Sequence, residues 1–106
     1  MGADNGVGGA IFLDVATDPK NPLELGRYND FYLHDGMARG DTLWGGAINN
    51  GFFTVVDVSD KANPVTMATQ QTPNSFTHNC WISDDGNTLF AQGADHAKEL
   101  CDLNAG

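Results

Sequence analysis

The chain repeats one short motif at a spacing of 43 residues, and this repeat restricts the possible folds more than any other feature. Each copy, at residues 11–22 and 53–64, reads as an apolar run containing an aspartate, a hydroxyl-Asp turn and then Asn-Pro. Asp14 and Asp57 lie 43 residues apart, and Asp102 follows 45 residues later in a third, incomplete copy. A fixed period of about 20–50 residues is typical of propellers, solenoids and other repeat architectures.

A second element recurs with the same period. His34 and His78 lie 44 residues apart, and each precedes a turn and a short apolar run, at residues 41–44 and 87–90. Two motifs that share one period are hard to obtain by chance. The sequence therefore predicts one supersecondary unit that recurs along the chain.

One unit reads as four strands joined by tight turns. We expect these strands at residues 31–37, 42–48, 52–58 and 65–69. Asn49-Asn50-Gly51 predicts a hairpin turn of the primed type, because Asn and Gly tolerate the positive φ that such turns need. Pro64 suits the first residue of an edge strand, since proline has no N–H to donate to a ladder.

The third expected strand is apolar on both faces, at Phe52, Phe53, Val55, Val56 and Val58. A sheet with one wet face would alternate apolar and polar residues, whereas the middle strands of propeller blades are covered on both sides. A parallel α/β sheet also buries both faces, but its crossovers need about a dozen residues, and no capped segment with helical period stands out. We therefore predict an all-β fold, a partial β-propeller with antiparallel four-stranded blades.

The 106 residues hold about two to three blades. In a single propeller fragment, residues 1–30 would supply the third and fourth strands of one blade, and residues 31–70 a complete blade. Residues 71–106 would form an incomplete blade, with strands at 76–82 and 88–91. Closed propellers have about 4–8 blades. We therefore expect partners that cover the open faces, either the remaining blades of a longer chain or further copies of this chain.

The charge balance argues against two classes of partner. Five basic and fourteen acidic residues give a net charge of −9. Such a surface repels the phosphate backbone of nucleic acids and the headgroups of anionic membranes. No stretch approaches the ~20 apolar residues of a membrane span. Residues 1–5 lack the basic and apolar regions of a signal peptide.

Several segments resemble a known family of bacterial surface propellers. Residues 55–60 (VVDVSD) with 63–65 (NPV) are similar to the LVIVD repeat, and residues 41–48 (DTLWGGAI) and 76–86 (FTHNCWISDDG) to the choice-of-anchor B family that carries it. The resemblance covers residues 9–91 and fades after Phe90. It implies a secreted or cell-surface propeller, and it brings no catalytic residue and no cofactor.

His34 and His78 are the candidate metal ligands. They occupy equivalent places at the start of the expected innermost strands. With histidines from further blades they would ring the central channel and bind a metal or another ligand. The alternative, which we favour, is that each histidine stabilises its own blade by hydrogen bonding to a neighbouring turn, because a residue that recurs in every repeat usually serves the repeat.

The recurring aspartates Asp14, Asp57 and Asp102 have two interpretations. They would be either acid/base or calcium-binding carboxylates, or acceptors for the backbone of the following turn, which we favour. Residues 84–87 (DDGN) contain only part of a calcium-loop motif, so we expect an ordinary turn. Asp95 and His96 would form a metal site only if the fold brought them to Cys80 or His78.

The cysteines Cys80 and Cys101 are too far apart for a CxxC pair. One disulfide is possible, but we expect two free thiols. Cys80 follows His78 by two residues, so a Cys-His nucleophile pair on one strand face is conceivable. A buried cysteine that packs as a small apolar group is commoner. We expect Trp44 and Trp81 to pack between blades.

Two functions follow from these observations. The first, which we favour, is a non-catalytic cell-surface or secreted propeller that binds an extracellular protein or a polysaccharide through its loops. The second is a propeller enzyme, for example a metal-assisted hydrolase that uses channel-facing His and Asp residues. No phosphate loop, nucleophile elbow or HExxH motif is present in the sequence.

Overall fold

The computed structural model describes residues 7–93 and 98–102, and this part of the chain contains only β-strands and one short 3₁₀ turn, η1 Pro73–Ser75. The prediction of an all-β, antiparallel fold is confirmed. No helix in the described ranges is long and apolar enough to cross a membrane. The strands are β1 Ala10–Asp14, β2 Leu23–Tyr28, β3 Asp35–Arg39, β4 Thr42–Ala47, β5 Phe52–Asp57, β6 Val65–Gln71, β7 Thr77–Ile82, β8 Thr88–Gly93 and β9 Lys98–Asp102.

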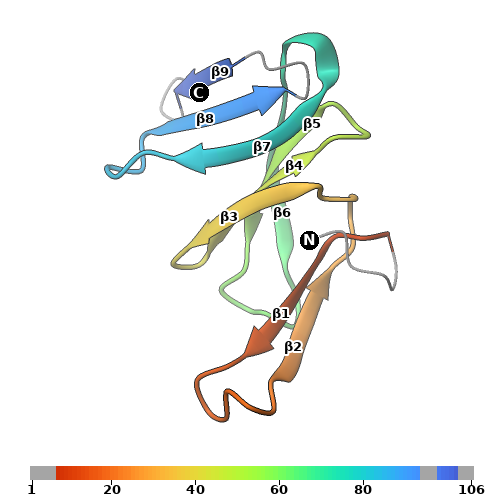
Figure 1. The fold of residues 1–106 in the computed structure, drawn as a ribbon, viewed down its shortest axis with the longest axis vertical. Helices are drawn as coiled ribbons and strands as arrows, with labels where there is room; N and C mark the ends of the chain where they lie inside the picture. Colours follow the sequence, from red (N-terminus) through yellow and green to blue (C-terminus); the bar gives the residue numbers. More distant parts are fainter. Residues whose placement is uncertain (1–6, 94–97, 103–106) are drawn as a thin grey trace.

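The strands form three sheets in chain order (Figure 1). The first sheet is β1-β2, the middle sheet is β3-β4-β5-β6 and the third sheet is β7-β8-β9. Within each sheet, strands that follow one another in sequence are hydrogen-bonded neighbours, so each sheet is a simple meander. The middle sheet is the four-stranded unit expected from the repeat.

The expected strand positions agree with the observed ones except at the start of the middle sheet. β3 begins at Asp35, four residues after the expected start, because the preceding segment links the first sheet to the middle one. There the Leu33 N–H donates to the Gly8 carbonyl (3.2 Å), and the His34 N–H donates to the Gly46 carbonyl (2.9 Å). His34 therefore lies just before β3 rather than within it.

The turn between β4 and β5 is not of the primed type that the Asn-Asn-Gly sequence predicts. Among the described residues outside glycine, only Ser75 has positive φ, so Asn49 and Asn50 do not. The loop has four residues, 48–51, rather than the expected three, 49–51, since Ala47 and Phe52 are the closing pair. The N–H groups of Asn50 and Gly51 both donate to the Ala47 carbonyl, and Gly51 alone adopts the left-handed conformation (φ +78°).

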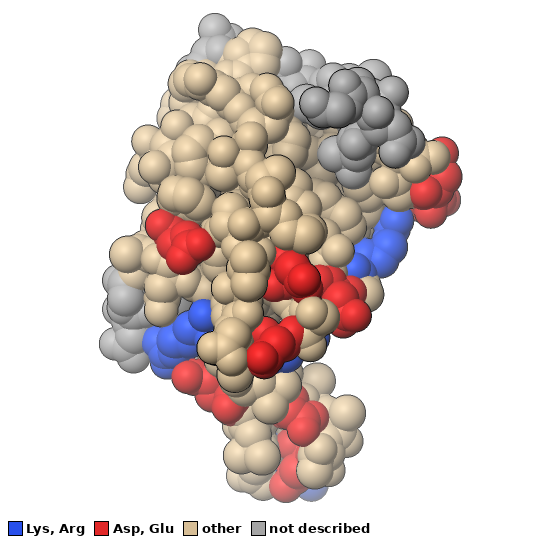
Figure 2. Space-filling model, turned by 180° about the vertical axis from the view of Figure 1, so that it is seen from behind, with Lys and Arg blue, Asp and Glu red and all other residues tan. Residues whose placement is uncertain are grey.

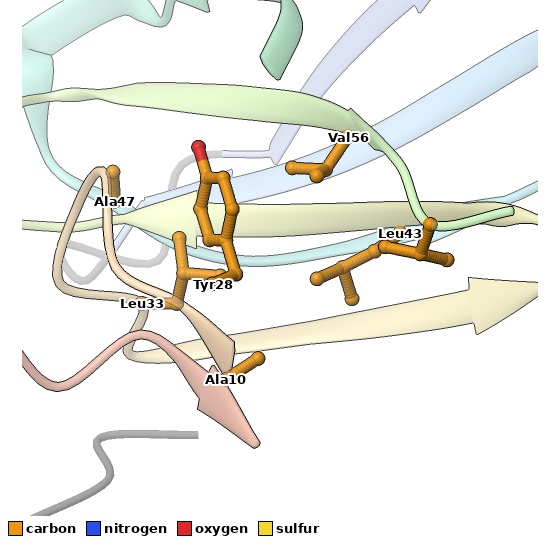
Figure 3. Close-up of a cluster of buried hydrophobic side chains, with 7 residues drawn as sticks. Ala10, Tyr28, Leu33, Leu43, Ala47 and Val56 are labelled. Carbon is orange, nitrogen blue, oxygen red and sulfur yellow. The ribbon is translucent and has the colours of Figure 1, made fainter. Parts of the chain in front are cut away.

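The two central strands of the middle sheet, β4 and β5, are covered on both faces. On one face, Leu43, Ala47, Val56 and Val58 pack against Ala10, Tyr28 and Leu33 from the first sheet and the linker (Figure 3). On the other face, Trp44 and Phe53 pack against the third sheet, at Cys80, Ile82, Leu89 and Ala91. The two-sided apolar pattern of residues 52–58 thus corresponds to a strand covered by two other sheets.

The turns that follow β1 and β5 are built alike. Asp18 Oδ1 accepts from the Lys20 N–H and Asp60 Oδ1 from the Ala62 N–H, at 3.1 Å in both turns. The second carboxylate oxygen of each aspartate accepts from the side-chain amide of Asn21 or Asn63. The repeated Asp…Asn-Pro motif therefore encodes one turn geometry that occurs twice.

Acidic side chains are unevenly distributed over the surface. In the view of Figure 2 most of the visible Asp and Glu side chains lie in the lower half, which corresponds in Figure 1 to the first sheet and the turns near it. The turn carboxylates Asp14, Asp18 and Asp60 belong to this region of the fold.

Candidate functional site

The structure brings His34 and His78 together. Their Nε2 atoms lie 3.1 Å apart, and the ring centroids are 4.4 Å apart with an interplanar angle of 62°. His34 is exposed just before β3, and His78 is half-buried in β7. The nitrogens are closer than the ring centres, so the two imidazoles converge at their Nε2 edges.

A β-bulge sets the position of His78. Thr77 pairs with Gly93 and Asn79 pairs with Gln92. Their partners are adjacent on β8, so β7 holds one extra residue, His78, between the two pairs. A bulge of this kind changes the direction of the side chain at the extra residue. His78 is that residue, and its ring meets His34 from the neighbouring sheet.

Gly46 allows the two sheets to approach at this point. A Cβ atom on Gly46 would lie 3.0 Å from the His78 carbonyl oxygen and 3.3 Å from that of Thr77. Any larger residue would therefore push the start of β7 away from β4. Gly46 also accepts the backbone N–H of His34, so one residue of β4 positions both histidines.

The contact between β3 and β7 continues along both strands, which lie side by side (Figure 1). The Met37 Sδ accepts from the Ile82 N–H at 2.9 Å, and the Arg39 guanidinium donates to the Ser83 carbonyl at 2.7 Å. Arg39 and Ser83 are 44 residues apart, which is also the separation of His34 and His78. The two strands therefore meet at positions that are equivalent in the repeat.

The aspartates Asp14 and Asp57 are turn acceptors, as expected. Asp14 accepts from the N–H groups of Ala16 and Thr17 and from the Thr17 hydroxyl, and Asp57 accepts from the Ser59 N–H. These bonds favour the charged carboxylates and lower the pKa of both aspartates. Their carboxylate oxygens are occupied by local backbone and hydroxyl donors. The side chain of Asp102 lies outside the described residues.

The expected ordinary turn at residues 84–87 is also confirmed. Asp85 Oδ1 accepts from the Ser83 hydroxyl (2.6 Å) and from the Asn87 N–H (3.0 Å), and the pKa of Asp85 is lowered, first by the Ser83 bond. Gly86 takes positive φ. The proposed site with Asp95 and His96 falls outside the described residues.

Cys80 is a buried free thiol rather than half of a nucleophile pair. It is 4% exposed and packs between the middle and third sheets. Burial, followed by the negative charge of Asp35, raises its pKa to about 12. An activated cysteine needs a lowered pKa. The side chain of Cys101 is not among those described.

Two residues at the contact were not expected from sequence to belong to it. Arg39 belonged to no motif, and Gly46 appeared only within the segment 41–48 of the family resemblance, although a glycine inside a strand hints at close backbone approach. A third feature, the buried Tyr28 hydroxyl, bonds Thr66 at 2.6 Å and Thr54 at 3.3 Å and so joins the first and middle sheets. Only the fold brings these positions together.

Within the described part of the chain, no group of three or more His, Cys, Asp and Glu side chains is arranged to hold a metal ion. The histidines form a pair, with Nε2 atoms from two different sheets. Comparisons with protein-family models, with curated proteins and with solved structures find no match for this chain.

Proposed function

We propose that the chain is a run of consecutive β-propeller blades and that it acts as a non-catalytic binding or adhesion module, secreted or displayed on a cell surface. The observation that carries the proposal is the contact between repeat-equivalent positions, His34 with His78 and Arg39 with Ser83. When repeated units are related by rotation about a central axis, neighbouring units contact each other near that axis through equivalent residues. β3 and β7 would then be the innermost strands of successive blades.

The apolar face of the third sheet supports the same architecture. Trp81 and Phe90 are cross-strand partners on its outer face and are 62% and 50% exposed. Their equivalents in the middle sheet are Met37 and Trp44, which are also cross-strand partners and pack against the third sheet. A following blade would cover Trp81 and Phe90 in the same way.

The first sheet offers the complementary surface. Leu13 and Val15 are 50% and 56% exposed, whereas their equivalents 43 residues later, Val56 and Val58, are buried against the first sheet. Each sheet therefore has one face suited to the preceding blade and one suited to the following blade. In a solution of this chain alone, we propose that a second copy supplies the missing sheet.

The groups that most often do chemistry have structural roles here, which supports a binding function over catalysis. The carboxylates of Asp14, Asp57 and Asp85 hold turns, and the thiol of Cys80 is buried with a raised pKa. The resemblance to bacterial surface propellers adds the expected location and the class of partner, an extracellular protein or a polysaccharide.

Sedimentation velocity of the 106-residue chain over a range of concentrations tests the architecture. We expect concentration-dependent association that the double variant Trp81→Glu/Phe90→Glu abolishes, because two charges on that face would block docking of a sheet. Phe76→Glu is the control, since Phe76 is also an exposed aromatic residue (46%) but lies before β7. A chain that remains monomeric at all concentrations would contradict the proposal.

The histidine pair favours one alternative, a metal-assisted hydrolase. A panel of chromogenic esters, phosphate esters and glycosides, assayed with added Zn²⁺, separates the two functions. We expect no turnover above that of a His78→Ala variant. Turnover that disappears in His78→Ala, with an unchanged circular dichroism spectrum, would establish the enzyme and overturn the binding module.

A further inference from the structure

The convergence of two imidazoles from different sheets has a chemical use beyond packing. Neutral imidazole is a good ligand for Zn²⁺ and related transition metals, and a poor one for Ca²⁺ and Mg²⁺, which prefer oxygen. The Nε2 atoms of His34 and His78 lie 3.1 Å apart. We propose that this pair binds one divalent transition-metal ion, such as Zn²⁺, through both Nε2 atoms, with water in the remaining positions.

The separation of the two nitrogens fits a shared metal. With Zn–N bonds of about 2.0–2.1 Å, an ion that bridges nitrogens 3.1 Å apart subtends an N–Zn–N angle of about 100°. That angle is close to the tetrahedral value. His34 is exposed, so an ion and its water molecules can enter from solvent.

The proton balance is also simple. Without metal, the same distance fits an N–H···N hydrogen bond, in which one ring carries its proton on Nε2 and the other accepts. Metal binding requires both Nε2 lone pairs, so the donor ring moves its proton from Nε2 to Nδ1. Among the described residues, no hydrogen bond engages either Nδ1 atom, so both are able to hold that proton.

The site would join two sheets. His34 is anchored to β4 through the Gly46 carbonyl, and His78 belongs to β7. A bridging ion would therefore link the middle and third sheets, much as the Arg39 contact with Ser83 does further along the strands. With two protein ligands, the affinity would be lower than that of a closed structural site with four.

Isothermal titration calorimetry of the full chain with ZnCl₂ tests the proposal. We expect one Zn²⁺ per chain, and no binding of Ca²⁺ under the same conditions. His34→Gln and His78→Gln should each weaken Zn²⁺ binding at least about tenfold, because half of the protein ligands are lost. Asp84→Asn is the control for weak binding to surface carboxylates and should bind Zn²⁺ as the parent chain does. His96 is present in every variant, so any contribution that it makes to Zn²⁺ binding is the same in all of them and cancels when their affinities are compared.

A measurement on the parent chain guards against variants that fail to fold. In long-range ¹H–¹⁵N spectra of the imidazoles, Zn²⁺ should shift the Nε2 resonances of both His34 and His78. Unshifted Nε2 resonances, or Zn²⁺ binding that is equally tight in folded His34→Gln and His78→Gln, would overturn the site. Association through Trp81 and Phe90 does not depend on these histidines, so the two proposals can fail separately.

Discussion

The middle and third sheets carry the same motif in different surroundings. In the middle sheet, Trp44 is 9% exposed because the third sheet covers it. In the third sheet, the equivalent Phe90 is 50% exposed and its cross-strand partner Trp81 is 62% exposed. The comparison teaches that burial in this fold depends on a neighbouring sheet more than on the residue type at a repeat position.

The two sheets are not equivalent at the position of closest approach. Gly46, at which β7 approaches β4, corresponds to Gln92 in β8. A sheet that docked on the third one could not approach at this position as closely as the third sheet approaches the middle one, unless the Gln92 side chain turned aside. The start of β7 is therefore a contact specific to the middle and third sheets.

The largest expected change in the free energy of unfolding comes from truncating Trp44, the buried member of the equivalent pair Trp44 and Phe90. Trp44→Ala should lower the free energy of unfolding by about 3–5 kcal/mol, because it removes a large side chain from between two sheets. Phe90→Ala should change it by less than about 1 kcal/mol, since half of that side chain is already in water. Urea unfolding followed by circular dichroism measures both. Equal losses for the two variants would mean that the two positions do not differ in burial.

The next largest loss of stability is expected at Gly46, where the start of β7 approaches β4 closely. Gly46→Ala should destabilise the fold by about 1–3 kcal/mol, because the new methyl group would lie 3.0 Å from the His78 carbonyl oxygen. The same variant should change the imidazole resonances of His34 and His78. Gln92→Ala, at the equivalent position, should leave the stability within about 0.5 kcal/mol of the parent chain. If Gly46→Ala has the parent stability, the sheets do not approach as closely as described.

The reactivity of Cys80 reports whether the middle and third sheets stay together. With its pKa raised to about 12, the Cys80 thiol stays almost entirely protonated at pH 8. In a Cys101→Ser variant, which leaves Cys80 as the one thiol, we expect almost no reaction with a thiol reagent in buffer and complete reaction in urea. Rapid reaction in buffer would show that the contact opens readily.

The smallest expected effect is at the turn after β5, which has the same geometry as the turn after β1 in the first sheet. Hydrogen bonds from Ser59 lower the pKa of Asp57 in the folded chain. Its contribution to stability is therefore present above the unfolded pKa of about 3.9 and is lost as the pH falls through the lower folded value. Asp57→Asn should melt at a slightly lower temperature than the parent at pH 7, and the difference should shrink at pH 2. A difference that is larger at pH 2 would contradict this role for the charge.

Much of the fold could be predicted from the sequence because the repeat fixes strands and turns locally. The period placed β4, β5 and β6 nearly correctly, and the apolar pattern of residues 52–58 predicted a strand covered on both faces. The predicted start of β3 was wrong, because the backbone N–H groups of Leu33 and His34 donate to glycines distant in sequence, which no local pattern indicates. The type of the β4-β5 turn was wrong because loop length depends on which residues close the hairpin.

The candidate site was only half predictable. The spacing of His34 and His78 singled out both residues, but whether their rings meet depends on the bulge in β7 and on the missing side chain of Gly46. Arg39 gave no signal, since a lone exposed arginine on a strand is common. The roles of Asp14 and Asp57 were predictable because each bonds within its own turn.

The unlike faces of each sheet give the molecule a direction. Val56 and Val58 pack against the first sheet, which precedes the middle sheet in the chain. Trp44 and Phe53 pack against the third sheet, which follows it. Two copies that joined through the exposed ends would repeat the same rotation and could never form a twofold dimer with identical surfaces in contact. Successive additions would either close into a ring, if the rotation from one copy to the next divides the circle evenly, or continue as a helical fibre.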